Sequence, residues 1–215
     1  MTPAAQLLAG MQRMAHTGLN QGTSGNLSVR TPEGFLVTPS GVPVERLRAE
    51  DMVPMRLDGT AHGHTRPSSE WRMHRDLYAA FPAAQAVAHA HPPHATALAC
   101  RREGIPAFHY MVAVAGGHDI RCADYATFGT AALSTNAIAA LRGRTACLLA
   151  NHGILAYGAD LERAIALALE VEALARQYLL ARQQGEPVLL DAAEMDNILV
   201  RFKSYGVQPD QEETP

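Results

Sequence analysis

Residues 86–94 read Ala-Val-Ala-His-Ala-His-Pro-Pro-His, and this stretch predicts both a central strand and half of a metal site. Its small apolar start is typical of a strand buried on both faces, and the two prolines end that strand. On a strand, His89 and His91 point the same way because side chains alternate between the two faces. Two imidazoles on one face are half of a zinc site. His94 lies beyond the prolines and is expected to point elsewhere.

The remaining metal ligands must come from other parts of the chain, and two candidates stand out. His152, in Asn151-His-Gly153, follows a strand expected at 145–150, so its ring can project from the strand end into a cleft. Glu70, in the Pro-Ser-Ser-Glu-Trp segment at 67–71, lies near a helix start and could be a metal ligand, a general base, or each in turn. Taken alone, His152 also fits a structural histidine, and the segment fits an ordinary capped helix start.

The bulk composition is that of one compact domain. The chain has 215 residues, 47% hydrophobic and 18% charged, with a formal net charge of −3, and this length can bury a substantial core. The weak charge argues against nucleic acid or a membrane surface as the main partner. No apolar run approaches the ~20 residues that span a bilayer, and residues 1–18 have helical rather than signal-like patterning. Three widely spaced cysteines exclude a disulfide framework. We therefore expect a cytoplasmic protein.

Lysine is almost absent from this chain, and that absence narrows the possible chemistry. Lys203 is the only lysine, and it lies near the C-terminus. Schiff-base catalysis needs a lysine in a desolvated pocket, and a P-loop needs one behind its glycines. Neither mechanism has a candidate residue here, so carbonyl chemistry in this protein would have to use a metal.

Hydrophobic periodicity and turn residues divide the chain into helices and strands without a linker or repeat. The helices are expected at 3–16, 69–81 with Ser69 as its cap, 93–103, 126–141, 160–184 and 191–205. The strands are expected at 26–30, 34–38, 52–57, after the Asp58-Gly59 turn, at the histidine pair, at 110–114 and at 145–150. Hairpins mixed with helices favour a mixed or largely antiparallel sheet covered by helices.

Three short turns rich in glycine and hydroxyl residues are candidate anion sites. They are Gly-Thr-Ser-Gly-Asn at 22–26, Thr-Pro-Ser-Gly at 38–41, and Ser68-Ser69. Each can direct backbone N–H groups and hydroxyls at an anion, and the serine pair lies at a helix N-terminus, where the dipole favours a phosphate. Such residues are common in turns, so one turn alone indicates little. The three turns together with a metal motif predict a phosphate site built mostly from neutral donors.

These segments together resemble the class II aldolase/adducin superfamily, and within it the branch that cleaves L-fuculose 1-phosphate. The resemblance covers nearly the whole chain and implies an α/β fold: one three-layer α-β-α domain over residues 1–215, with a central mixed, largely antiparallel sheet covered by helices. It runs through Gly-Thr-Ser-Gly-Asn-Leu-Ser-Val-Arg at 22–30, Thr-Pro-Ser-Gly at 38–41, Ser-Ser-Glu-Trp-Arg-Met-His at 68–74, His-Ala-His at 89–91, Phe-His-Tyr-Met at 108–111, Ala-Gly-Gly at 115–117, Tyr-Ala-Thr-Phe-Gly-Thr at 125–130 and Asn-His-Gly at 151–153.

The resemblance implies a role for each candidate residue. One zinc ion per subunit would be bound by His89, His91, His152 and, in the resting state, Glu70. On substrate binding, Glu70 would leave the metal and act as acid and base. The substrate phosphate would lie among Thr23, Gly25, Asn26, Ser40, Gly41, Ser68 and Ser69.

Two further tyrosines take their expected roles from the same resemblance. Tyr110 corresponds to a tyrosine that reaches the active site from the neighbouring subunit of a cyclic homotetramer. The segment from about 203 to 215 resembles a mobile C-terminal tail whose tyrosine, here Tyr205, closes over the site as a lid. His74 lies one turn beyond Glu70 on the same helix face and is interpreted as a supporting or structural residue rather than a ligand.

The implied reaction is the reversible cleavage of a ketose 1-phosphate to dihydroxyacetone phosphate and an aldehyde. L-Fuculose 1-phosphate, which gives L-lactaldehyde, is the expected substrate, and 5-deoxyribulose or methylthioribulose 1-phosphate are the alternatives. Zinc would act as the Lewis acid in place of a lysine. The superfamily also contains sugar-phosphate epimerases, decarboxylases and a dehydratase, and Tyr110 favours the aldolase branch. Retention of every ligand position argues against a non-catalytic adducin-like interaction module, and the two prolines after His91 argue against a binuclear hydrolase.

Overall fold

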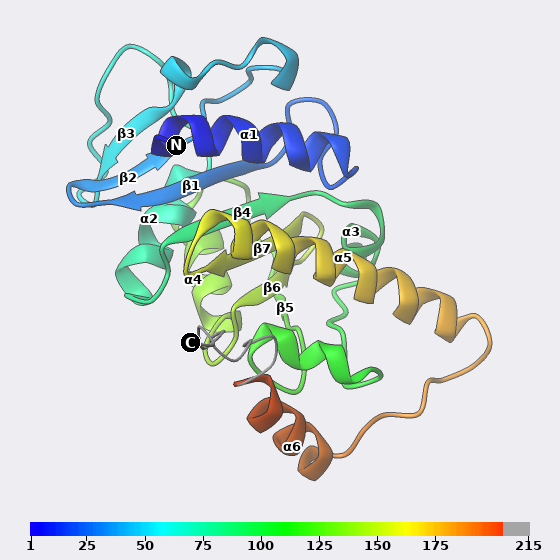
Figure 1. Ribbon diagram of the computed structural model, residues 1–215. Helices are drawn as coiled ribbons and strands as arrows, with labels where there is room; N and C mark the ends of the chain where they lie inside the picture. Colours follow the sequence, from blue (N-terminus) through cyan, green and yellow to red (C-terminus); the bar gives the residue numbers. More distant parts are fainter. Residues whose placement is uncertain (204–215) are drawn as a thin grey trace, which may run out of the picture.

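A seven-stranded β-sheet forms the centre of the protein (Figure 1). The computed structural model describes residues 1–203. The strands lie in the order β3-β2-β1-β4-β7-β6-β5, and every neighbouring pair is antiparallel except β5 and β6. Their bounds are β1 (Asn26–Thr31), β2 (Gly34–Val37), β3 (Val53–Arg56), β4 (Ala86–Ala90), β5 (Cys122–Ala123), β6 (Ala146–Leu149) and β7 (Gly153–Gly158). The mixed, largely antiparallel sheet expected from the sequence is confirmed.

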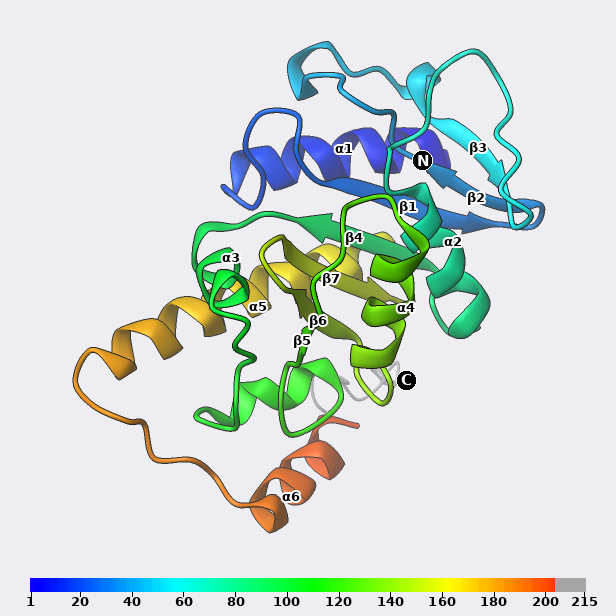
Figure 2. The same cartoon turned by 180° about the vertical axis from the view of Figure 1, so that it is seen from behind.

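Helices cover both faces of this sheet and complete a three-layer α-β-α fold (Figures 1 and 2). The first layer shares one hydrophobic core with the sheet and contains α1 (Pro3–His16), α3 (Pro93–Cys100) and α5 (Leu161–Arg182). The second layer shares a separate core with the opposite face and contains α2 (Trp71–Ala80) and α4 (Ala131–Ala140). The 3₁₀ helices η1 (Val44–Arg46) and η2 (Ala49–Asp51) precede β3, and η3 (Tyr110–Ala115) and the last helix, α6 (Ala192–Phe202), add buried residues to the core of the first layer. The expected three-layer fold is confirmed.

Strand β4 lies in the middle of the sheet, and its alternation assigns its side chains to the two layers. Ala86, Ala88 and Ala90 belong to the core that contains α5, where small side chains let a helix approach closely. Val87 belongs to the core under α2 and α4. His89 has the same parity as Val87, so it points toward the layer that carries α2. The expected strand around the histidine pair is therefore confirmed, and it directs His89 toward the start of α2.

The helix at 69–81 forms, but Ser69 is not its cap. Helix α2 begins at Trp71, and Glu70 occupies the N-cap position without a capping hydrogen bond from its own side chain. The backbone N–H of Glu70 donates to Ser68 Oγ at 3.2 Å. Because its carboxylate is turned toward Asn26 and His89, this helix start is shaped by the site rather than by capping.

Other expected elements differ from the structure for local reasons. The strand expected at 110–114 is the 3₁₀ helix η3, whose first turn is capped by the His109 ring as it accepts from the Met111 N–H. The helix expected from 126 begins at Ala131, because Thr130 caps it by accepting from the Leu133 N–H. After the Asp58-Gly59 turn only an isolated bridge to Ala61 forms, not a strand.

Two strands were not expected from the sequence. Strand β7 follows β6 after only three residues, and no element was assigned to its residues from the sequence. Strand β5 is two residues long and leaves no period to detect. Residues 204–215, which include Tyr205, lie outside the described part of the chain, so the expected tail and lid stay predictions. No helix within residues 1–203 is both long and apolar enough to cross a membrane.

Candidate active site

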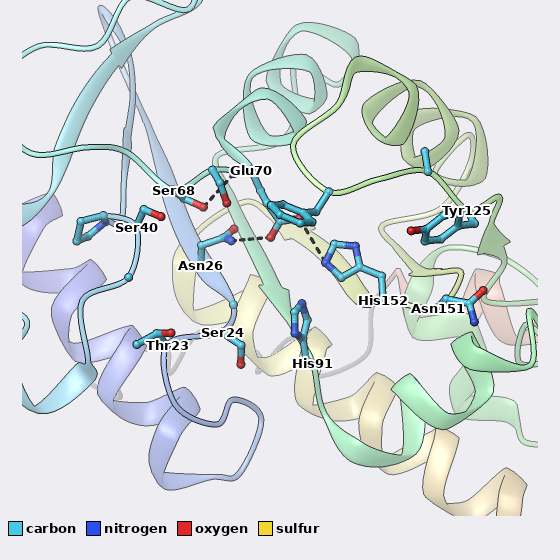
Figure 3. A pocket seen from close by; sticks show the side chains of 16 residues that line it. Thr23, Ser24, Asn26, Ser40, Ser68, Glu70, His91, Tyr125, Asn151 and His152 are labelled. Atoms are coloured by element: carbon cyan, nitrogen blue, oxygen red, sulfur yellow. Dashed lines mark hydrogen bonds and ion pairs between the residues drawn. The ribbon is translucent and has the colours of Figure 1, made fainter.

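Four side chains from distant parts of the chain converge in one cluster: Glu70, His89, His91 and His152. Their potential ligand atoms all lie within 4.8 Å of one another. Glu70 is the N-cap residue of α2, His89 lies on β4, His91 follows that strand, and His152 lies in the turn between β6 and β7. Figure 3 shows Glu70, His91 and His152 around a common space. The structure thus brings together the four residues that the sequence singled out.

The turn between β6 and β7 places His152 in this cluster. Asn151 adopts a left-handed backbone conformation with φ of 54°, and its side chain bonds to Arg102 and to the Cys100 carbonyl. At Gly153 the chain passes so close to β4 that a Cβ atom would lie 2.3 Å from the Ala90 carbonyl oxygen. Asparagine is one of the few residues that tolerate the left-handed region, and only glycine fits the close approach. The Asn-His-Gly sequence therefore fixes where the ring points.

His89 presents a lone pair to the cluster. Its Nδ1 lies 2.7 Å from the backbone carbonyl oxygen of Ile154. A carbonyl oxygen only accepts, so Nδ1–H donates to it and the neutral ring keeps its lone pair on Nε2. Metal-binding histidines are commonly oriented by such a bond from the other ring nitrogen.

Acceptor atoms face one another in the cluster. His89 Nε2 lies 3.0 Å from Glu70 Oε2 and 2.9 Å from His91 Nε2, so its lone pair faces a carboxylate oxygen that can also only accept. Glu70 Oε1 is buried and has no hydrogen bond, although His152 Nε2 lies 3.3 Å away. A divalent cation among these atoms would satisfy all of them, and three imidazole nitrogens with one carboxylate are a donor set typical of zinc. The residues therefore fit a metal centre.

Burial and neighbouring charges set the protonation states of the cluster. Burial opposes the ionisation of Glu70, but His89 and His152 hold the pKa of its carboxyl group well below its usual range. Burial, reinforced by His89, lowers the pKa of His91 to about 3 and that of His152 to about 4. For His89, burial opposes the charged form, but Glu70 raises the pKa overall. The ionised carboxylate and the neutral rings of His91 and His152 are the forms that bind a metal.

His94 is not part of the cluster, as its position beyond the prolines suggested. Its Nδ1 lies 2.6 Å from Glu172 Oε1, on helix α5. The same carboxylate accepts the backbone N–H groups of His94 and Ala95. Glu172 thus supplies a negative charge to the N-terminus of α3, and His94 serves the packing of α3 on α5.

A cavity of about 320 Å³ opens in front of the cluster. Its floor is formed by Glu70, His91 and His152, while His89 lies buried behind them. The cavity walls contain all seven residues expected to surround a phosphate, which are Thr23, Gly25, Asn26, Ser40, Gly41, Ser68 and Ser69. Ser24 and Pro39 line the same walls, which are drawn in Figure 3. The structure therefore brings the three glycine- and serine-rich turns to one place.

Backbone pairing between two of these turns leaves their hydroxyls for a ligand. The Ser40 N–H donates to the Arg66 carbonyl, and the Ser68 N–H donates to the Thr38 carbonyl. Ser68 Oγ accepts from the Glu70 N–H, so its own proton can be donated into the cavity. The side chain of Asn26 is directed differently, because its Nδ2 donates to Glu70 Oε2 at 3.1 Å.

The sequence did not assign four further residues that line the cavity. They are Tyr125, Ala126, Phe128 and Asn151, and Figure 3 shows Tyr125 and Asn151 on the side away from the phosphate turns. Tyr125 is 52% exposed and Phe128 is 63% exposed, which is unusual for large aromatic side chains. The sequence signal was the Tyr-Ala-Thr-Phe-Gly-Thr stretch at 125–130, which contains two aromatic residues in a turn before a helix. Tyr110 does not line this cavity: it lies in η3, 50% exposed, with its ring stacked on His109.

Comparisons with known proteins identify the family of this chain. Residues 5–179 match the family model described as the Class II Aldolase and Adducin N-terminal domain. The 5-methylthioribulose-1-phosphate/5-deoxyribulose-1-phosphate aldolase of Rhodospirillum rubrum is 52% identical over 200 residues, which cover 93% of this chain and 90% of that protein. The L-fuculose phosphate aldolase of Escherichia coli strain K12 is 45% identical over 206 residues, covering 95% and 96%. A solved structure of an L-fuculose 1-phosphate aldolase superposes with a TM-score of 0.91 at 44% identity, covering 94% of this chain and 96% of that one.

Proposed function

The chain belongs to the class II aldolase and adducin family and is a class II aldolase, a carbon–carbon lyase, and we propose that it reversibly cleaves a ketose 1-phosphate to dihydroxyacetone phosphate and an aldehyde. One observation carries this proposal: the Glu70 and histidine cluster forms the floor of a cavity whose walls offer neutral donors for a phosphate. The complete donor set disfavours a non-catalytic adducin-like role.

We propose that the cluster holds one zinc ion per subunit, with Glu70 as the fourth ligand in the resting state. The bound ion supplies a Lewis acid that polarises a substrate carbonyl. Thr23, Ser40 and Ser68 bind the phosphate through their hydroxyls. They are assisted by the backbone of Gly25, Asn26 and Gly41 and by Ser69, which line the same cavity.

Glu70 is proposed to move the proton at carbon. In condensation it takes a proton from the hydroxymethyl carbon of dihydroxyacetone phosphate, and in cleavage it returns that proton to the same carbon. The carboxylate can reach a bound substrate because it lies at the cavity, where it is 6% exposed. A general base must come within about 3 Å of the carbon-bound proton, which places the reacting carbon against the cavity floor.

Tyr110 is proposed to act at the oxygen of the aldehyde, from a neighbouring subunit of a homotetramer. In cleavage it takes the proton of the hydroxyl that becomes the aldehyde, and in condensation it returns it. Its exposed position away from the cavity of its own chain supports this arrangement.

A cytoplasmic location is also proposed, which the three unpaired thiols among the described residues support.

Subunit complementation tests the shared site. We expect Tyr110→Phe and Glu70→Gln proteins, each nearly inactive, to recover activity when unfolded together and refolded as hybrids. In a cyclic tetramer about a quarter of the sites would combine an intact Glu70 with an intact tyrosine from the neighbour, so about a quarter of wild-type activity should return. Hybrids that stay inactive would show that both residues serve the same subunit's site.

Three ketose 1-phosphates, in two groups, are candidate substrates. The sequence resemblance favours L-fuculose 1-phosphate, which gives L-lactaldehyde. The 52% identity with the Rhodospirillum rubrum aldolase, against 45% with the Escherichia coli one, favours 5-deoxyribulose or methylthioribulose 1-phosphate as the second candidate. All three share the phosphorylated end and differ at the aldehyde end, which would face Tyr125 and Phe128 if the phosphate occupies the serine-rich turns.

A substrate panel scored by kcat/KM separates these candidates. We expect cleavage of ketose 1-phosphates and a loss of at least about 100-fold for the same sugars without phosphate, because several hydrogen bonds to a charged group would be lost. The ratio of kcat/KM for L-fuculose 1-phosphate to kcat/KM for methylthioribulose 1-phosphate then identifies the branch of the family. Equal kcat/KM for phosphorylated and free sugars would contradict the assigned phosphate site.

Two glycines in one turn provide a matched test of the phosphate site. Gly22 and Gly25 both have positive φ, 63° and 74°, but a Cβ atom meets nothing at Gly22 and would lie 2.2 Å from the buried Asn20 side chain at Gly25. We expect Gly22→Ala to cost about 1–2 kcal/mol of stability and to leave KM nearly unchanged. Gly25→Ala should displace the turn and raise KM for the sugar phosphate about 10-fold or more. Steady-state kinetics and thermal unfolding measure both, and equal KM values would contradict the assignment.

A further inference from the structure

A row of buried polar side chains lies directly behind Glu70. Helix α2 contributes Glu70, His74 and Tyr78, which lie one turn apart on one face of the helix. Strand β1 contributes Asn26 and Ser28, which lie two residues apart on one face of the strand. None of the five is more than 6% exposed. The proposed mechanism uses only the Glu70 end of this row.

Four hydrogen bonds join these side chains in alternation between helix and strand. Asn26 Nδ2 lies 3.1 Å from Glu70 Oε2, and Asn26 Oδ1 lies 2.5 Å from His74 Nε2. On the other side of the ring, His74 Nδ1 lies 2.7 Å from Ser28 Oγ. Ser28 Oγ in turn lies 2.8 Å from the Tyr78 hydroxyl. Every polar side-chain atom of the row beyond Glu70 therefore has a partner within the row.

The direction of each bond follows from the carboxylate. An ionised Glu70 only accepts, so the amide nitrogen of Asn26 must face it and the amide oxygen must face His74. That oxygen accepts, so His74 Nε2 carries a proton. The ring is buried without a carboxylate against it, and this burial lowers its pKa to about 3, so the ring is neutral and Nδ1 is an acceptor.

The far end of the row completes the same direction. Because His74 Nδ1 accepts, the Ser28 hydroxyl donates to it and the Tyr78 hydroxyl donates to Ser28. Burial raises the pKa of Tyr78, so this phenol keeps its proton. The Arg30 guanidinium lies 4.7 Å from the centre of the Tyr78 ring and donates to the Tyr78 carbonyl, which holds the tyrosine in place. All four bonds therefore donate toward Glu70.

We propose that His74 is a positioning residue for Glu70: its Nε2–H fixes the Asn26 amide so that an N–H always faces the catalytic carboxylate. If the His74 ring were protonated at Nδ1 instead, the lone pair of its Nε2 would face a lone pair of Asn26 Oδ1. The Asn26 amide would then turn over. Its oxygen would then face the carboxylate, which is repulsive in a buried site. The inference rests on the proposed role of Glu70 as the group that moves the proton, and it assigns the side chain of Asn26 to Glu70 rather than to the phosphate.

Variants at His74 separate positioning from simple packing. A glutamine places an N–H near the position of Nε2, whereas an asparagine reaches only the position of Nδ1. We expect His74→Asn to slow deuterium exchange into saturating dihydroxyacetone phosphate about 10- to 100-fold, the usual cost of removing a partner of a ligand, with KM and zinc content nearly unchanged. His74→Gln should stay within about 3-fold of wild type. Tyr78→Phe, which removes a hydroxyl from the same row but leaves the bonds next to Glu70, is the control and should also stay within about 3-fold.

A spectroscopic measurement tests the same inference without using activity. In zinc-loaded protein labelled with ¹⁵N-histidine, and with His74→Gln used for assignment, long-range ¹H–¹⁵N spectra should show His74 as the neutral tautomer protonated at Nε2. The tautomer protonated at Nδ1 would overturn the inference, as would a His74→Asn exchange rate equal to wild type or a loss of rate in Tyr78→Phe as large as in His74→Asn. If the wild type shows no exchange at all, the proposed function fails, and the tautomer alone then decides the direction of the row.

Discussion

Replacing Glu70 with glutamine is expected to slow deuterium exchange at the hydroxymethyl carbon of dihydroxyacetone phosphate by about 10³-fold, while zinc stays bound. Glutamine has nearly the same shape but does not take a proton, and general base catalysis contributes about 10²- to 10⁴-fold. Three imidazoles remain to hold the metal, as in sites that keep one position open. The loss should appear in the exchange rate and only weakly in KM, because the phosphate contacts lie on other residues.

The measurement is proton NMR of dihydroxyacetone phosphate in heavy water, with metal content determined on the same samples. Glu50→Gln is a suitable control, because Glu50 lies exposed in η2, far along the chain from the cluster and not among its residues. Exchange at the wild-type rate in Glu70→Gln with zinc bound would remove Glu70 from the proton transfer. If Glu70→Gln loses both its zinc and its exchange activity, Glu70 acts chiefly as a metal ligand.

Replacing His91 with alanine is expected to weaken zinc binding, so that a weak chelator removes the ion, and to reduce exchange by more than about 10³-fold. The side chain faces the cavity at the end of β4 rather than the hydrophobic core, so the fold should tolerate the change. Two imidazoles and a carboxylate can hold zinc, but Glu70 is proposed to leave the ion when substrate binds, and only two imidazoles would then hold it. The second effect follows from the first, since polarisation of the carbonyl depends on the ion.

His94→Ala is the matched control for this prediction. The two histidines are three residues apart, but the ring of His94 bonds to Glu172 instead of the cluster. His94→Ala should keep one zinc per subunit and near wild-type exchange, with a modest loss of thermal stability. Zinc analysis after dialysis against a weak chelator measures both variants. Full zinc content in His91→Ala, or its loss in His94→Ala, would contradict the assigned ligand set.

The metal cluster could be predicted from the sequence because strand geometry leaves little freedom there. Two histidines separated by one residue, before a pair of prolines, have only one reasonable arrangement, and Ala86–Ala90 forms the strand that this reading requires. The ligand roles of His152 and Glu70 were harder to predict from the sequence, because each residue also fits a structural role. Their convergence depends on the β6–β7 turn and on the start of α2, which are tertiary features.

The row behind Glu70 shows what the sequence could not specify. The spacing of Glu70, His74 and Tyr78 on one helix face was visible, but nothing local indicated that Asn26 and Ser28 would fill the spaces between them. In the same way, η3 has the composition of a strand, and its 3₁₀ conformation depends on a cap from the His109 ring. The cavity wall at Tyr125 and Phe128 was missed because the motif lies in a turn whose position is set by α4 and β5. These features depend on contacts between distant segments, for which local periodicity carries no signal.

Deuterium exchange into dihydroxyacetone phosphate, followed as zinc is removed and returned, tests the central claim most directly. Exchange should disappear when a chelator strips the metal and should return in proportion to added zinc, reaching its maximum at one ion per subunit. The same titration in Glu70→Gln should restore zinc binding without restoring exchange. Exchange that persists in the metal-free protein, or that stays absent at one bound zinc per subunit, would contradict the assignment of this site as a metal-dependent aldolase centre.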